Sequence, residues 1–141
     1  MLKTVVIAPH LRRQIEDEAR KALPGECCGL LQGVRSFDDV IVEVVHPARN
    51  LAEANDRFEI DPAEHFRLLR QARVTGQEIV GCYHSHPNGC PAPSDTDGEY
   101  ALEHDFVWLI AAVTPDACDL AAFTPENGAF RGLRLAKTRE N

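Results

Sequence analysis

The sequence has no apolar run that approaches the roughly 20 residues of a membrane-spanning helix. Its first residues, Met1 to Val6, show neither the apolar core nor the cleavage site of a secretory signal peptide, so we expect no such peptide. No Cys-x-x-Cys spacing occurs among the five cysteines, and an odd number of thiols argues against a disulfide framework. These absences predict reduced cysteines and a cytoplasmic protein.

An excess of positive charge is also lacking. The chain has 15 Lys and Arg against 22 Asp and Glu, which gives a net charge of -7. Because a negative field repels phosphate groups, we expect no nucleic-acid partner, and nothing in the chain predicts a membrane partner. A hydrophobic share of 44% and a length of 141 residues are typical of one soluble globular domain with its own core.

Hydrophobic patterning predicts a mixed α/β domain. Apolar runs predict strands at residues 4–8, 29–31, 40–45, 78–84, 106–113, 120–124 and 129–135. Helices are expected over residues 11–23, from Asp61 to about Gly76, and from Ser94 onward. The polar, aperiodic stretch 47–58 predicts a long surface loop, and Asn127-Gly128 predicts a hairpin turn. We expect a single domain over residues 1–136 and a frayed tail over residues 137–141.

Groups able to bind a metal are concentrated in the 14 residues from His84 to Asp97. Side chains two apart on a strand point to the same face, so His84 and His86 can close on one ion. Asp97, from the next element, can supply a third ligand. Two imidazoles and one carboxylate leave a tetrahedral zinc with one open position, as in hydrolytic sites. Water in that position has its pKa lowered from about 15.7 toward about 7.

Hydrolysis also needs groups that move a proton and stabilise developing charge. A carboxylate near the water can take its proton and pass it to the leaving amine, an effect of about 10²–10⁴-fold. Glu26 is the best candidate, because it lies between the helix stop Pro24-Gly25 and an apolar strand. Ser94 can donate a hydrogen bond to the developing oxyanion.

Each of these features also has an ordinary structural explanation. A single His-x-His on a strand is weak evidence for metal binding. Ser94 and Asp97, three residues apart, can simply cap a helix, although a cap would also orient Asp97. A lone acidic residue such as Glu26 is most often a surface group. Only their combination favours a metal site.

This combination resembles the JAMM (MPN+) metalloprotease signature. The matching residues are His84-x-His86-Pro87-x6-Ser94-x2-Asp97, with Glu26 upstream in Gly25-Glu26-Cys27-Cys28-Gly29-Leu30-Leu31. The likeness is closest to small prokaryotic members and covers nearly the whole chain. It implies a curved mixed sheet flanked by helices, similar to the cytidine-deaminase fold. It also implies that His84, His86 and Asp97 bind one zinc ion, that Glu26 is the general acid/base, and that Ser94 stabilises the tetrahedral intermediate.

The resemblance also implies a substrate. Family members cleave amide bonds after the Gly-Gly tail of ubiquitin-like proteins, and the small bacterial ones resemble partners of sulfur-carrier proteins. Cys90 departs from the pattern as either an inert loop thiol or a redox-sensitive group that competes for zinc. Cys27 and Cys28 are expected in the core near the site, and Cys82 and Cys118 on buried strands. The sequence leaves the oligomeric state open.

Three other functions share part of this pattern. A non-catalytic MPN-type scaffold would share the fold but would lack the ligand set, which is intact here. Two histidines and a carboxylate also form the facial triad of non-haem iron proteins and cupins, but cupins are all-β and this chain predicts two amphipathic helices. The signature of zinc nucleoside deaminases is absent.

Overall fold

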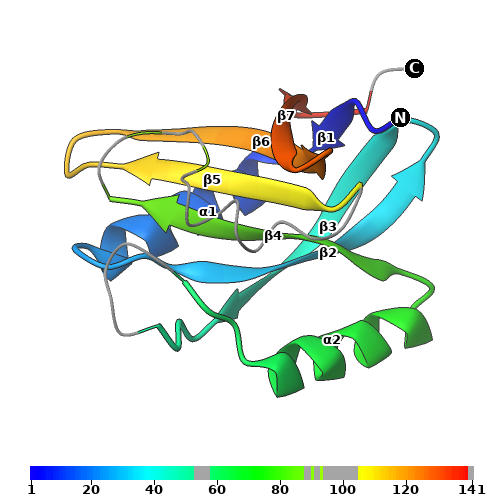
Figure 1. Ribbon diagram of the computed structural model, residues 1–141, viewed down its shortest axis with the longest axis horizontal. Helices are drawn as coiled ribbons and strands as arrows, with labels where there is room; N and C mark the ends of the chain where they lie inside the picture. Colours follow the sequence, from blue (N-terminus) through cyan, green and yellow to red (C-terminus); the bar gives the residue numbers. More distant parts are fainter. Residues whose placement is uncertain (53–57, 88–89, 91–92, 94–104, 140–141) are drawn as a thin grey trace.

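Strands dominate the computed structural model, which describes residues 1–52, 58–87, 90, 93 and 105–139. Within these residues the strands are β1 (Thr4–Val6), β2 (Cys28–Ser36), β3 (Asp39–Ala48), β4 (Glu78–His86), β5 (Val107–Val113), β6 (Cys118–Glu126) and β7 (Ala129–Ala136). The helices are α1 (Pro9–Ala22) and α2 (Pro62–Val74), shown with the strands in Figure 1. The single-domain α/β class and the two amphipathic helices are therefore confirmed.

The sheet is closed, which corrects the expected curved sheet with helices along its faces. Its strand order is β1-β3-β2-β4-β5-β6-β7. The first strand of this series, β1, also pairs with the last, β7, and this pairing closes the sheet. Val5 pairs in parallel with Val40 of β3 on one side and with Leu135 of β7 on the other. Because β1 pairs along both of its sides, β3 and β7 do not remain as edge strands, and the sheet forms a barrel.

The two helices cover separate parts of the sheet (Figure 1). In α1 the buried residues Leu11, Ile15 and Ala19 recur every four positions and belong to the main core of the barrel. In α2 the buried residues are Leu68 and Ala72, which belong to a second, smaller core cluster. The sheet therefore has apolar packing on both faces.

Both ends of α2 follow the sequence prediction. The Asp61 side chain accepts a hydrogen bond from the Ala63 N–H at 2.9 Å, and Pro62 occupies the first helical position. Gly76, just past the end of α2, has a φ of 76°, a left-handed conformation that glycine adopts without strain. The predicted third helix from Ser94 lies outside the described residues.

Strands β4 and β5 form the centre of the sheet next to the site. All residues of β5 are buried, as the unbroken apolar run predicted, and β4 is buried from Ile79 to its end. β4 runs two residues beyond the predicted end, to His86. Residues 82, 84 and 86 share one strand face, and Cys82 packs in the second cluster beside α2. The histidines therefore project toward that side of the sheet.

The hairpin between β6 and β7 also follows the prediction. Asn127 and Gly128 have φ values of 52° and 78°, as a two-residue turn of the primed type requires. β3 reaches Ala48, so the predicted surface loop begins later than residue 47.

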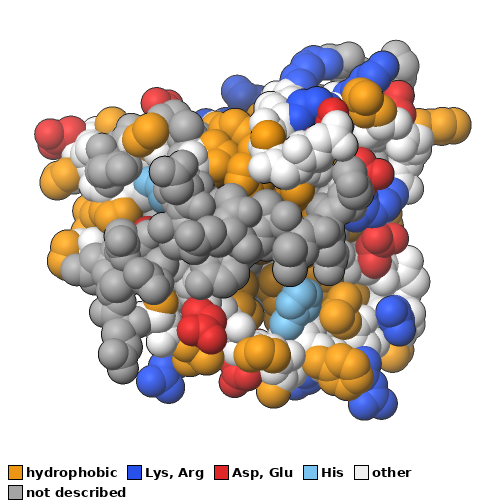
Figure 2. All heavy atoms as spheres, viewed as in Figure 1, with side chains coloured by type: hydrophobic (Ala, Val, Ile, Leu, Met, Phe, Trp, Pro, Cys, Tyr) orange, Lys and Arg blue, Asp and Glu red, His pale blue; other side chains and the backbone are white. Residues whose placement is uncertain are grey.

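Basic, acidic and hydrophobic side chains are interspersed on the face shown in Figure 2. Within the described residues, no helix has the length and apolar character needed to traverse a bilayer.

Candidate metal centre

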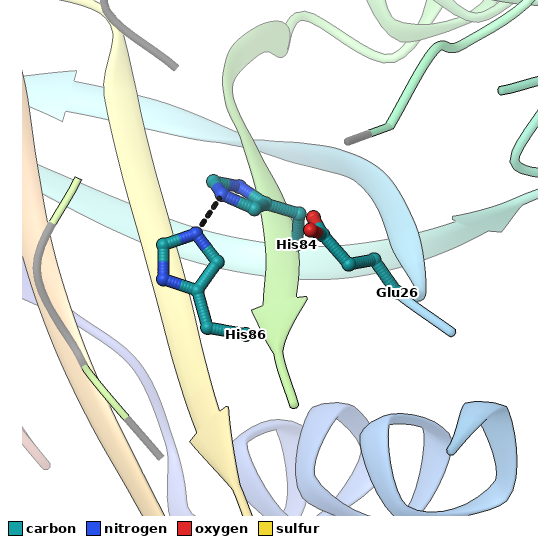
Figure 3. Close-up of side chains that lie close together, drawn as sticks. All are labelled: Glu26, His84 and His86. Atoms are coloured by element: carbon teal, nitrogen blue, oxygen red, sulfur yellow. Dashed lines mark hydrogen bonds between the residues drawn. The ribbon is translucent and has the colours of Figure 1, made fainter. Parts of the chain in front are cut away.

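His84 and His86 lie at the end of β4 and face each other (Figure 3). Their Nε2 atoms are 3.0 Å apart, and their side chains are 0% and 5% exposed. Two nitrogens bound to one tetrahedral zinc at 2.0–2.1 Å are separated by about 3.3 Å. The spacing of the imidazoles is therefore close to what a shared ion requires.

A second contact of His86 determines which of its nitrogens is available. Its Nδ1 lies 2.9 Å from the backbone carbonyl oxygen of Cys90. Because a carbonyl only accepts hydrogen bonds, Nδ1 carries the proton, and in the neutral ring Nε2 keeps its lone pair. Contacts of this kind orient histidines that bind metals. Nε2 of His86 is therefore aimed at His84 as an electron-pair donor.

Glu26 completes the cluster from the segment between α1 and β2 (Figure 3). One of its carboxylate oxygens and the ring nitrogens of His84 and His86 all lie within 4.8 Å of one another. Glu26 is buried, with only 8% of its surface exposed. Two imidazoles and a carboxylate in a buried cluster are a donor set that suits zinc. The residues present therefore fit a divalent metal.

Backbone contacts join the Glu26 segment to β4. The N–H of Cys27 donates to the Ser85 hydroxyl at 2.8 Å, and the N–H of Ser85 donates to the carbonyl of Cys27 at 3.1 Å. Ser85 lies between the two histidines, so its side chain points to the opposite face of β4. The sequence reasoning missed this role of Ser85, although its position in His84-Ser85-His86 could have indicated it.

Asn50, just after β3, holds the same segment from another side. Its side-chain amide donates to the carbonyl oxygen of Glu26 at 3.0 Å. Sequence reasoning placed Asn50 in the predicted surface loop and did not predict this contact, because nothing in the local pattern indicates a partner 24 residues away.

Aromatic rings pack around His84. The ring of Phe58 stacks on His84 with centroids 4.4 Å apart and an angle of 18° between the planes. Trp108 of β5 meets His84 edge-on at 5.7 Å. These rings restrict the orientation of the imidazole and keep water from its faces. The contact of Phe58 with His84 was not predicted from the sequence.

The cysteines near the centre are buried thiols. Burial raises the pKa of both Cys27 and Cys28 to about 12, so both are neutral at physiological pH. Their burial and that of Cys82 confirm the expected core positions. Cys118 is only half-buried, because it opens β6 at the margin of the sheet, and this corrects the expectation of a buried residue. Cys90 is exposed.

The structure thus brings together Glu26, His84 and His86 among the residues proposed for the site. Ser94 and Asp97 lie outside the described residues. The third metal ligand and the oxyanion donor therefore stay predictions, as do the individual roles of the other three residues.

The fold and this donor set define an α/β protein with a buried candidate metal centre. The chain belongs to the family described as prokaryotic homologs of the JAB domain, whose model matches residues 8–124. This finding confirms the resemblance to the JAMM family drawn from the motif.

Relatives of known name align along most of the chain. The desampylase of Haloferax volcanii is 37% identical over 135 residues, covering 92% of this chain and 94% of the relative. The CysO-cysteine peptidase of Mycobacterium tuberculosis is 27% identical over 126 residues, covering 89% and 85%. A solution structure of a Desulfitobacterium hafniense protein superimposes with a TM-score of 0.86 at 29% identity, covering 96% of this chain and 94% of that one.

Proposed function

We propose that this protein is a zinc-dependent peptidase that cleaves the amide bond after the C-terminal Gly-Gly of a ubiquitin-like or sulfur-carrier protein. The observation that carries the proposal is the buried cluster of Glu26, His84 and His86 at the end of β4. Family membership and two relatives named desampylase and CysO-cysteine peptidase support the reaction class and the kind of substrate.

His84, His86 and Asp97 are the proposed zinc ligands. The ion, when bound, supplies Lewis acidity that lowers the pKa of a water molecule and polarises the scissile carbonyl. His86 presents Nε2 because its Nδ1–H donates to the Cys90 carbonyl. Phe58 holds the His84 ring by stacking on it. The two imidazoles are therefore oriented before substrate arrives.

Glu26 is the proposed general acid/base. Its carboxylate lies beside the two imidazoles and can accept a proton from the attacking water at one oxygen. The same oxygen then delivers that proton to the leaving amine, and such a transfer contributes about 10²–10⁴-fold. In the buried setting of Glu26, electrostatic effects are stronger than in water. Ser94 is proposed to donate a hydrogen bond to the oxyanion.

We also propose a cytoplasmic setting for the reaction. All five cysteines are free thiols in the structure, and all five lie within the described residues. Proteins of oxidising compartments that have this many cysteines usually pair them.

Incubation of the zinc-loaded protein with carrier proteins that have a C-terminal extension after Gly-Gly tests this function. Intact-mass measurement should show loss of the extension only, leaving the carrier with a Gly-Gly terminus. A carrier in which Gly-Gly is replaced by Ala-Ala should stay intact and serves as the matched control. A protein that binds these carriers tightly but cleaves none would be a non-catalytic scaffold, which would contradict the proposal.

A further inference from the structure

We infer that Asn50 is a positioning residue that sets Glu26 and the His84 ring relative to each other. This inference rests on the proposed function, because it assigns Asn50 a role through the proposed acid/base and a proposed metal ligand.

The amide nitrogen of Asn50 contacts the segment that carries Glu26. Its Nδ2 donates to the backbone carbonyl of Glu26 at 3.0 Å, across 24 residues of sequence. The N–H of Cys27, in the same peptide group as that carbonyl, donates to the Ser85 hydroxyl of β4. The backbone of Glu26 is therefore fixed at its own carbonyl and at the next N–H, which limits where its carboxylate can lie.

The amide oxygen of Asn50 contacts the segment that packs on His84. Its Oδ1 accepts from the N–H of Glu59 at 3.0 Å, and the carbonyl of Glu59 accepts from the N–H of Leu51 at 2.9 Å. Glu59 follows Phe58, whose ring stacks on His84 at 4.4 Å. Through one side-chain amide, Asn50 therefore connects the segments that place Glu26 and the His84 ring.

A purely local role would not require both the amide nitrogen and the amide oxygen of Asn50. The Oδ1 of Asn50 also accepts from the N–H of Ala52 at 2.9 Å, which is the usual asparagine turn over its own two following residues. That turn leaves the Nδ2 donor unexplained. The donor instead reaches a distant segment that carries the proposed acid/base. The need for a donor and an acceptor at once explains why an amide occupies this position.

Two variants distinguish the contacts that the Asn50 side chain makes. N50D keeps Oδ1 and replaces the donor with an acceptor that faces the Glu26 carbonyl. N50S can keep the local turn through its hydroxyl, but serine is too short to reach Glu26. N127D makes the same chemical change at the β6–β7 turn and is the matched control.

The test combines kinetics with a measurement on the metal-free protein. A displacement of about 1 Å at a reacting group can cost about 10²-fold in rate. For N50D and N50S we expect kcat to fall about 10- to 100-fold, with KM and zinc content close to those of the wild type and N127D. In the metal-free variants, hydrogen exchange should be faster in peptides that contain Glu26–Cys27 or Phe58–Ile60, and unchanged in β6 and β7.

Each result decides one of the two proposals. Wild-type kcat in N50D and N50S would overturn the positioning role, and so would a loss of zinc and folding in step with activity. If the wild-type protein has no turnover, the proposed function fails, and exchange in the metal-free protein decides the role of Asn50. Faster exchange at both segments would support that role, and unchanged exchange would overturn it.

Discussion

Cys27 and Ser85 are joined by two hydrogen bonds. The N–H of Cys27 donates to the Ser85 hydroxyl at 2.8 Å, and the N–H of Ser85 donates to the Cys27 carbonyl at 3.1 Å. Cys27 follows Glu26, and Ser85 lies between His84 and His86. One residue pair therefore connects the proposed acid/base to the strand that carries two of the proposed ligands, His84 and His86. The connection is buried, so its loss should be measurable in the stability of the fold.

We predict that Ser85→Ala destabilises the protein. The variant leaves the buried N–H of Cys27 without its acceptor, and an unsatisfied buried donor costs about 1–3 kcal/mol. Urea unfolding measures the free energy of unfolding. Ser36→Ala, at the end of β2, removes a hydroxyl that accepts an exposed hydrogen bond from Arg139, and should change the free energy by less than about 0.5 kcal/mol. Equal stabilities of the two variants would argue against the Cys27–Ser85 connection.

Glu26→Gln should keep stoichiometric zinc while hydrolysis falls by about 10²-fold or more, because the amide cannot accept the proton. Metal analysis and intact-mass kinetics on the same preparation measure both quantities. Glu43→Gln makes the same change at an exposed position of β3 and should keep full activity. Full activity in Glu26→Gln would remove Glu26 from the role of acid/base.

His84→Ala and His86→Ala should each abolish zinc retention after dialysis, since each removes one of two converging nitrogens. Inductively coupled plasma mass spectrometry measures the zinc that remains. His10→Ala, at the exposed start of α1, controls for loss of a surface histidine. Tight zinc in either site variant would show that the metal binds elsewhere.

Glu18 of α1 should make stability depend on pH. Burial raises the pKa of Glu18 above its ordinary value of 4.5, while the hydrogen bond from the Tyr83 hydroxyl at 2.7 Å lowers it. The folded state therefore holds the Glu18 proton more tightly than the unfolded state. The stability that this proton contributes is fully present below pH 4.5 and is lost as the pH rises through the pKa of Glu18 in the folded state. Glu18→Gln should therefore gain stability relative to the wild type between about pH 4 and pH 7 in urea unfolding. A constant difference between the two proteins across this range would contradict the shift.

The shared face of the two histidines and several elements of the fold could be predicted from local sequence. The alternation of side chains on a strand placed His84 and His86 on one face, and the continuous apolar run identified β5 as a buried strand. The Asn127-Gly128 turn and the Asp61 cap depend on neighbours within a few residues. Local chemistry determines these features, so local sequence reveals them.

Features that depend on distant partners could not be predicted. β1 has three residues, and its pairing of Val5 with both Val40 and Leu135 closes the barrel across the length of the chain. Asn50 and Ser85 act on backbone groups 24 and 58 residues away. No sequence periodicity encodes such contacts, because they arise only when the sheet has assembled.

Anomalous diffraction from a crystal of the zinc-loaded protein is the most direct test of the hydrolytic centre. We predict one zinc ion with His84 Nε2 and His86 Nε2 at about 2.0–2.1 Å, a carboxylate oxygen of Asp97, and a solvent molecule that faces Glu26. A zinc ion enclosed by four protein ligands, or one bound away from these histidines, would contradict the proposed enzyme.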